Sequence, residues 1–307
     1  MHESFHFSMN IRTASCGRPG PLNFCAGPTG RAVQVARAAW CAFMLMGLGR
    51  SPAAAAPWGL TLSWTNNLLT IASPDLPGGK LEVLYLEAFC QTKAHDQDWH
   101  KTTLPHKTQL VSASKDGRQL RLLTRVQPEV EVSHEVRADR DEVEFVFRLT
   151  NRGKERVDLD WLQPACIRVD RFTGLGQSNY IERSFIFTER GLTMMSQTRR
   201  TTEALYKGGQ VYVPPEIPLE DANPRPISLD RPVNGLIGCV SADQRWLLAT
   251  AWDRTHELFQ GVYVCLHADP HVGGLAPAET KRVRGKLYFL KNDPKLLLKR
   301  YERDFGK

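Results

Sequence analysis

Residues 252–271, with the sequence WDRTHELFQGVYVCLHADPH, hold the side chains best suited to acid–base chemistry. Successive side chains of an extended strand alternate between two faces, so Cys265, His267 and Asp269 share one face. His271 joins them only if the intervening proline leaves the strand straight. Imidazoles and carboxylates transfer protons or bind zinc and iron, so His267 and Asp269 are candidate catalytic residues. The alternative is a strand-ending turn with His267 as a hydrogen-bonded rim residue.

His256 is the third candidate catalytic residue, because it would face the same cleft as His267 if the two segments pair as strands. Trp252 lies close by and is a candidate for substrate binding. An indole ring can cover the C–H groups of a sugar while polar neighbours bind its hydroxyls. Tryptophan is more often buried in a core, so the alternative places Trp252 in the core and His256 on the surface.

A second candidate site is the polar stretch at residues 95–100, HDQDWH, in which Asp98, Trp99 and His100 are candidate substrate-binding residues. Loops often carry binding residues, although a solvated polar loop is the alternative. Arg183 is a further candidate, because a guanidinium group can neutralise an acidic sugar. No spacing singles out Arg183, and a solvated surface residue is its alternative. His134 alternates in register with two valines, which favours a hydrogen-bonded core histidine.

Several classes of function find no support in the sequence. It has no GxSxG elbow, phosphate-binding glycine loop, HExxH motif, EF-hand loop or CxxC pair, and no cofactor is expected. The chain has 40 Lys and Arg against 33 Asp and Glu, and removing residues 1–56, with five Arg and one Glu, leaves 35 against 32. These charges are scattered, so no nucleic-acid partner is expected.

Residues 31–56 have the form of a secretory signal. Arg31 and Arg37 precede an apolar run at 38–48, which is shorter than the roughly 20 residues of a membrane-spanning helix. Small residues follow up to Ala56. We therefore predict a leader and signal peptide at 1–56, a single β-sandwich domain at 57–307, a secreted or periplasmic location, and no membrane attachment after cleavage. An uncleaved N-terminal anchor is the alternative.

Four cysteines remain beyond the leader: Cys90, Cys166, Cys239 and Cys265. An even number in an oxidising compartment is compatible with disulfides, for which three pairings exist. All four also lie in strand-like segments, which is equally compatible with buried thiols. The sequence does not decide between the two.

Short segments with alternating apolar residues dominate residues 59–290, and only residues 294–305 have helical spacing, after Asp293 as a predicted N-cap. The predicted strands are residues 59–64, 68–72, 81–89, 119–126, 130–137, 142–150, 157–169, 184–188, 209–213, 236–241, 246–252, 261–267 and 281–290. This pattern predicts an all-β fold, a large antiparallel β-sandwich or a barrel, with a short C-terminal helix. Residues 214–232 are rich in proline and should pack over one face or rim of the sheets.

Residues 132–161, VSHEVRADRDEVEFVFRLTNRGKERVDLDW, resemble the central part of galactose-mutarotase-like supersandwich proteins, which include sugar epimerases and domains of polysaccharide lyases. The resemblance implies a supersandwich-like fold with a concave carbohydrate-binding face. Such epimerases carry a His-Pro-aromatic sequence soon after the asparagine turn. Residues 161–166, WLQPAC, keep the proline without the histidine. Epimerase catalysis is therefore not transferred to this chain.

The hypothesis that these patterns favour is a secreted carbohydrate-binding or carbohydrate-processing β-sandwich protein, with an oligo- or polysaccharide as its partner. Whether it is an enzyme, and its oligomeric state, stay open. One alternative is a non-catalytic structural or interaction module of the cell envelope. The other is a metal-dependent enzyme centred on His267 and Asp269.

Overall fold

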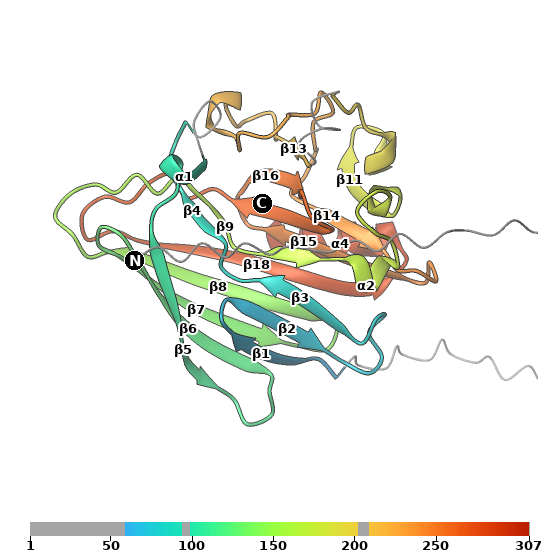
Figure 1. Cartoon of the computed structure of the whole chain (residues 1–307), viewed down its shortest axis with the longest axis horizontal. Helices are drawn as coiled ribbons and strands as arrows, with labels where there is room; N and C mark the ends of the chain where they lie inside the picture. Colours follow the sequence, from blue (N-terminus) through green and yellow to red (C-terminus); the bar gives the residue numbers. More distant parts are fainter. Residues whose placement is uncertain (1–58, 94–98, 202–208, 307) are drawn as a thin grey trace, which may run out of the picture. The chain divides into compact units, whose positions relative to one another are not determined.

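The computed structural model describes residues 59–93, 99–201 and 209–306 (Figure 1). These residues form an all-β sandwich of two large antiparallel sheets with a short C-terminal helix, as predicted. The predicted leader lies outside them. None of the helices in the described segments combines the length and the apolar character needed to cross a membrane.

The larger sheet of the described residues contains nine strands. In spatial order these are β12 (Gly191–Met194), β11 (Ser184–Thr188), β14 (Ile237–Val240), β15 (Trp246–Trp252), β18 (Thr280–Lys291), β8 (Glu142–Asn151), β7 (Val130–Ala138), β6 (Gln119–Val126) and β5 (His106–Ala113).

The smaller sheet contains seven strands in the described chain, in the order β1 (Thr61–Thr65), β2 (Leu68–Ala72), β3 (Lys80–Leu84), β10 (Cys166–Arg168), β17 (Cys265–Pro270), β16 (Thr255–Gln260) and β13 (Gln210–Tyr212). Strands β4 (Ala88–Cys90) and β9 (Trp161–Gln163) form a separate two-stranded sheet. The helical segments are α1 (Trp99–Thr102), α2 (Asp170–Thr173), η1 (Tyr180–Glu182), η2 (Met195–Gln197), η3 (Leu219–Asp221) and α4 (Pro294–Phe305).

The core lies between the two large sheets, and the alternation of apolar residues places them there. In β8, Val143, Phe145, Phe147 and Leu149 are buried at every second position. They pack against the inner faces of β1, β2 and β3, which cross in front of β6, β7 and β8 in Figure 1. The side chains on the outer face of the smaller sheet are therefore free to build a site.

Two predicted strands are divided in the structure. Residues 81–89 supply the end of β3 and most of β4, and residues 157–169 supply β9 and β10. Pro164 lies between β9 and β10, where its missing N–H cannot join a ladder of hydrogen bonds. The division matters because β10 pairs with the start of β17, whereas Trp161 of β9 bridges to His271 just beyond its end, so the two strands bring separate side chains to it.

Helix α4 begins where the sequence predicts, at an Asp–Pro pair. Oδ1 of Asp293 accepts hydrogen bonds from the backbone N–H groups of Lys295 and Leu296, at 3.0 and 3.1 Å. Leu297 is fully buried against the outer face of the larger sheet. The helix thus packs on its own sandwich, and its last turn reaches the rim where β15 ends.

The proline-rich segment at 214–232 packs over the outer face of the smaller sheet. Its Ala222 joins an apolar cluster with Val211 of β13 and Phe259 of β16. The backbone N–H of Asn223 donates a hydrogen bond of 2.8 Å to Oε2 of Glu257. This segment therefore covers the polar side chains of β16 and β17.

Candidate functional site

Strands β16 and β17 gather most of the candidate residues. They pair antiparallel, with Glu257 opposite Asp269 and Phe259 opposite His267. Cys265, His267 and Asp269 share the outer face of β17, while the side chains between them pack in the core. His267 and Asp269 are nonetheless almost completely buried, because other segments lie over this face. The pairing therefore places a histidine and two carboxyl groups in a nearly dry site.

His267 lies between thiols and carboxyl groups. Its Nε2 is 3.5 Å from Sγ of Cys265, and its Nδ1 is 3.7 Å from Oε2 of Glu87 and 3.9 Å from Oδ1 of Asp269. Burial disfavours the imidazolium, but Cys166, Asp269 and Glu87 outweigh it and raise the pKa of His267 to about 10. Among the charged groups around His267, Glu87 faces solvent, with a side chain 36% exposed.

The surroundings of Asp269 disfavour its ionisation. Burial, and the neighbouring carboxylates of Glu257 and Glu87, raise the pKa of Asp269 well above its usual value, against the opposing effect of His267. Nε2 of Gln163 donates a hydrogen bond of 3.0 Å to Oδ2 of Asp269. Oδ1 of Asp269 is buried without a hydrogen-bond partner in the described structure. Burial and the neighbouring acidic groups thus make Asp269 harder to ionise than an exposed aspartate.

His256 lies at the start of β16, flat against an indole ring. Its ring stacks on Trp161 with centroids 4.8 Å apart and planes inclined by 3°. Its Nδ1 is 3.4 Å from Oε2 of Glu257, and its Nε2 is 3.9 Å from Oδ2 of Asp160. The stacking fixes the imidazole between two acidic side chains, and neither ring nitrogen has a hydrogen-bond partner in the described structure.

His271 follows β17 and is the least buried histidine of this group, with a side chain 27% exposed. Nη2 of Arg254 lies 3.2 Å from Nδ1 of His271 and can only donate, so Nδ1 accepts. The ring proton is then on Nε2, which donates to Oδ1 of Asp160 at 3.2 Å. Burial opposes ionisation of Asp160, but the hydrogen bond from His271 and the charges of His271 and His256 lower the pKa of Asp160.

These groups form one continuous series, which we call the acid–base line: His271, Asp160, His256, Glu257, Asp269 and His267. The side-chain atoms of successive members lie 3.2–3.9 Å apart, with one exception. The exception is Glu257 and Asp269, which are opposite each other in the pairing of β16 with β17. The members of the line interact electrostatically along the outer face of the smaller sheet, and a hydrogen bond joins His271 to Asp160.

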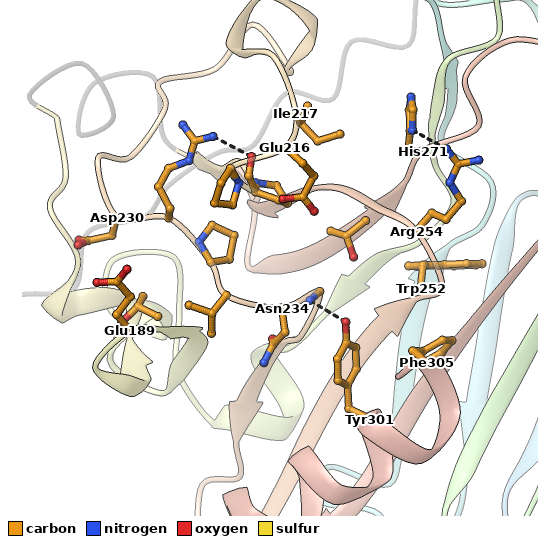
Figure 2. Close-up of a pocket in the computed structure, with 18 of the residues that line it drawn as sticks. Glu189, Glu216, Ile217, Asp230, Asn234, Trp252, Arg254, His271, Tyr301 and Phe305 are labelled. Carbon is orange, nitrogen blue, oxygen red and sulfur yellow. Dashed lines mark hydrogen bonds between the residues drawn. The ribbon is translucent and has the colours of Figure 1, made fainter. Parts of the chain in front are cut away.

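An open groove of about 940 Å³ lies at the His271 end of the acid–base line. Its walls are parts of residues 188–190, 214–217, 229–235 and 252–255, together with the end of α4 (Figure 2). Nη2 of Arg231 donates to the backbone oxygen of Pro214 at 2.7 Å, which ties the two halves of the proline-rich segment together. The hydroxyl of Tyr301 accepts from the N–H of Gly235 at 3.1 Å. These bonds hold the groove open from both sides.

The groove carries both charged and aromatic side chains. Figure 2 shows carboxylates at Glu189, Glu216 and Asp230 on one side, and the rings of Tyr301 and Phe305 on the other. The two rings pack with centroids 5.7 Å apart. The size lies in the range of about 300–1,000 Å³ usual for small-molecule sites.

Comparisons with known proteins found no matching family model and no matching curated protein. Solved structures do show similarity. A galactose mutarotase-like protein from Lactobacillus casei is 8% identical, with a TM-score of 0.39 and coverage of 75% of this chain and 99% of its own. A galactose mutarotase related enzyme from Lactobacillus acidophilus is also 8% identical, with a TM-score of 0.39 and coverage of 75% and 97%.

An Escherichia coli protein provisionally described as an aldose 1-epimerase is 12% identical, with a TM-score of 0.40, covering 76% of this chain and 99% of its own. The resemblance to galactose-mutarotase-like proteins predicted from residues 132–161 is confirmed, as a weak one. What this chain does must therefore be argued from its own side chains.

The three candidate catalytic residues, His256, His267 and Asp269, all belong to the acid–base line, and their catalytic role stays a prediction. Trp252 is 1% exposed and packs on Phe145 and Phe147, with ring centroids 5.7 and 5.1 Å away. Its edge reaches the floor of the groove (Figure 2). It is mainly a core residue.

The other predicted substrate-binding residues lie elsewhere. Asp98 falls outside the described residues, and the backbone of Trp99 and His100 begins α1. Nη1 of Arg183 donates to the backbone oxygen of Thr173 at the end of α2. Arg183 is thus bonded to the scaffold, and no contact described for it joins it to the groove or to the acid–base line.

The sequence alone did not identify Asp160, Glu257, Glu87 or Gln163 as site residues. Glu257 is next to His256 in the sequence and could have been included with it. The others come from segments around β4 and β9, and only the packing of these strands beside β17 brings them to His267 and His271.

The four cysteines of the described chain, Cys90, Cys166, Cys239 and Cys265, are all buried free thiols. The sequence left disulfides and buried thiols open, and the structure has buried thiols. Cys166 and Cys265 nevertheless lie together beside His267.

Proposed function

We propose that this chain binds a carbohydrate in the groove, and that His271 and Asp160 exchange protons with the bound sugar. The observation that carries the proposal is the position of His271. His271 borders the open groove, and its Nε2 bonds to the buried Asp160. A ligand in the groove can thereby contact the end of the acid–base line.

The lining of the groove suits a sugar. The rings of Tyr301 and Phe305 can cover the C–H groups of a pyranose, and the carboxylates and guanidinium groups can bind its hydroxyls. Arginines 190, 199, 231 and 254 also border the groove, so an acidic sugar fits as well as a neutral one.

His271 has the partners that a general base requires. A sugar hydroxyl that replaces Arg254 at Nδ1 would face a ring nitrogen with a free electron pair. The pKa of Asp160 is lowered, so its carboxylate stays ionised and stabilises the imidazolium that forms when His271 takes up the proton. His256 lies on the other side of Asp160 and adds a second imidazole to the same carboxylate.

Substitutions at the groove test this proposal. We expect His271→Ala and Phe305→Ala each to weaken binding of an oligosaccharide about tenfold or more, since each removes about 1.4 kcal/mol or more of contact. Isothermal titration calorimetry measures the dissociation constants. His106→Ala is the matched control, because His106 packs on Phe89 away from the groove. Equal affinities in all four proteins would exclude the groove as the binding site.

We also propose that the chain is exported by its leader and acts in the periplasm or outside the cell. The support is the sequence of residues 31–56, with its basic start, short apolar run and small residues. Expression of the full chain with N-terminal sequencing of the product tests this. A mature N-terminus near Pro57 in the exported fraction is expected, and an intact leader on protein retained in the cytosol would contradict it.

A further inference from the structure

We propose that Cys166, Cys265 and His267 bind a zinc ion. The proposal does not rest on the groove or on carbohydrate binding. The two Sγ atoms and a ring nitrogen of His267 all lie within 4.8 Å of one another. The three residues are 2% exposed, and they come from two paired strands, β10 and β17. Rigid strands hold the donors in place before any metal arrives.

The spacing of the donors agrees with zinc coordination. Zn–S bonds of about 2.3 Å and Zn–N bonds of about 2.0 Å at a tetrahedral angle place sulfur and nitrogen about 3.5 Å apart. Sγ of Cys265 is 3.5 Å from Nε2 of His267. A weak S–H···N hydrogen bond has the same length, so the distance alone does not decide between the two.

The other ring nitrogen of His267 supplies an independent observation. Nδ1 is buried and has no hydrogen-bond partner in the described structure, although Glu87 and Asp269 lie 3.7 and 3.9 Å away. A histidine that binds a metal through Nε2 carries its proton on Nδ1 and commonly directs it at a carboxylate. A small shift of the Glu87 side chain toward Nδ1 completes this arrangement.

Gly261 packs directly against the donors. A Cβ on Gly261 would lie 2.3 Å from Sγ of Cys265 and 3.5 Å from Nε2 of His267, so any side chain at this position would push on the thiol. The glycine thereby lets the backbone lie close to the donor set. Glu87, on the Nδ1 side of His267, is the solvent-facing residue of this group.

The donor set indicates the class of site. Two thiolates and one imidazole select a soft or borderline cation, and zinc sites with three protein ligands keep the fourth position for water or substrate. On binding, both thiols and a protonated His267 release their protons to solvent, so that no oxidant or reductant is required. The site differs from the sequence-based hypothesis, in which His267 and Asp269 were the centre, because the cysteines take the place of Asp269.

The test is zinc content. The untagged full chain, kept reduced, is incubated with ZnCl₂, passed through gel filtration and measured by mass spectrometry of the metal. We expect about one zinc per chain in the wild type and in Cys239→Ala, which removes a buried thiol of the larger sheet that is not one of the proposed ligands. Cys166→Ala and Cys265→Ala should each retain less than a tenth of that amount.

Cobalt distinguishes thiolate ligation from loose binding. The wild type with Co²⁺ should show thiolate-to-cobalt charge-transfer absorption in the near ultraviolet, and Cys166→Ser should lose it. Circular dichroism must show that the variants are folded, and Gly261→Ala serves as a second variant that keeps all three donors but displaces Sγ of Cys265, so it should also lose zinc. A wild type without bound zinc, Cys166 or Cys265 variants that keep it, or a Cys166–Cys265 disulfide in protein purified without reductant would each overturn the proposal.

Discussion

Replacing Trp252 by alanine is expected to lower the free energy of unfolding by about 3–5 kcal/mol. The indole is 1% exposed and packs on Phe145 and Phe147 in the core. It also lies flat on Gly285 of β18, which is opposite it in the sheet. A Cβ on Gly285 would be 2.4 Å from the indole ring. The alanine variant would leave a cavity that no neighbour can fill.

Urea unfolding followed by circular dichroism measures this loss. Trp246→Ala is the matched control, because Trp246 begins the same strand and is only half-buried, so a smaller loss is expected. Gly285→Ala should also destabilise, by about 1–3 kcal/mol, since its methyl group collides with the indole. A loss below about 1 kcal/mol in Trp252→Ala, together with lost sugar binding, would make the ring a ligand platform instead.

Acidification is expected to destabilise the protein through His134. His134 is 2% exposed, with Nδ1 3.2 Å from the hydroxyl of Tyr85 and Nε2 2.8 Å from Oγ1 of Thr124. Burial, with a smaller effect of the charge on His106, lowers the pKa of His134 to about 3. The sequence predicted a hydrogen-bonded core histidine at this position, and the structure has one.

Proton linkage gives the direction in which the free energy of unfolding changes with pH. The unfolded chain takes up a proton on this histidine near pH 6.5, and the folded protein takes it up only near pH 3. The contribution of neutral His134 is therefore fully present above pH 6.5 and is lost as the pH falls toward 3. The loss is about 1.4 kcal/mol per pH unit in this window, or roughly 3 kcal/mol between pH 6.5 and pH 4.

His134→Gln isolates this effect, because glutamine stays neutral and can still bond to Thr124. Its stability relative to the wild type should improve by roughly 3 kcal/mol between pH 7 and pH 4, measured by urea unfolding at each pH. His106→Gln, in the edge strand β5, is the control, and its free energy of unfolding should follow that of the wild type more closely across this pH range. If the free energies of unfolding of the wild type and of His134→Gln change equally with pH, the folded protein protonates His134 readily.

Strict alternation made most of the sandwich predictable. Strands such as β8 and β7 carry one apolar face, and their pattern marks them in the sequence. Strand β16 was not predicted, because it is buried on both faces and a register shift between Thr255 and Glu257 breaks its periodicity. Strand β5 was also not predicted, since it is an edge strand with mostly exposed side chains.

The candidate site was predictable only where its residues are neighbours in the sequence. His256, His267 and Asp269 belong to adjacent strands of one segment, and alternation alone places the last two on one face. Asp160, Cys166 and Glu87 come from β-segments far earlier in the chain. Their position depends on which strands flank β17, and no local pattern specifies that order.

Carbohydrate binding at the groove is the property of this chain that most needs a direct test. The decisive measurement is a thermal-shift screen of residues 57–307 against neutral and uronic-acid oligosaccharides and polysaccharides. A ligand that binds only the folded state raises the melting temperature. We predict a reproducible increase in the melting temperature with one class of glycan, and no such increase in His271→Ala. No increase with any glycan at millimolar concentration, or an equal increase in His271→Ala, would contradict it.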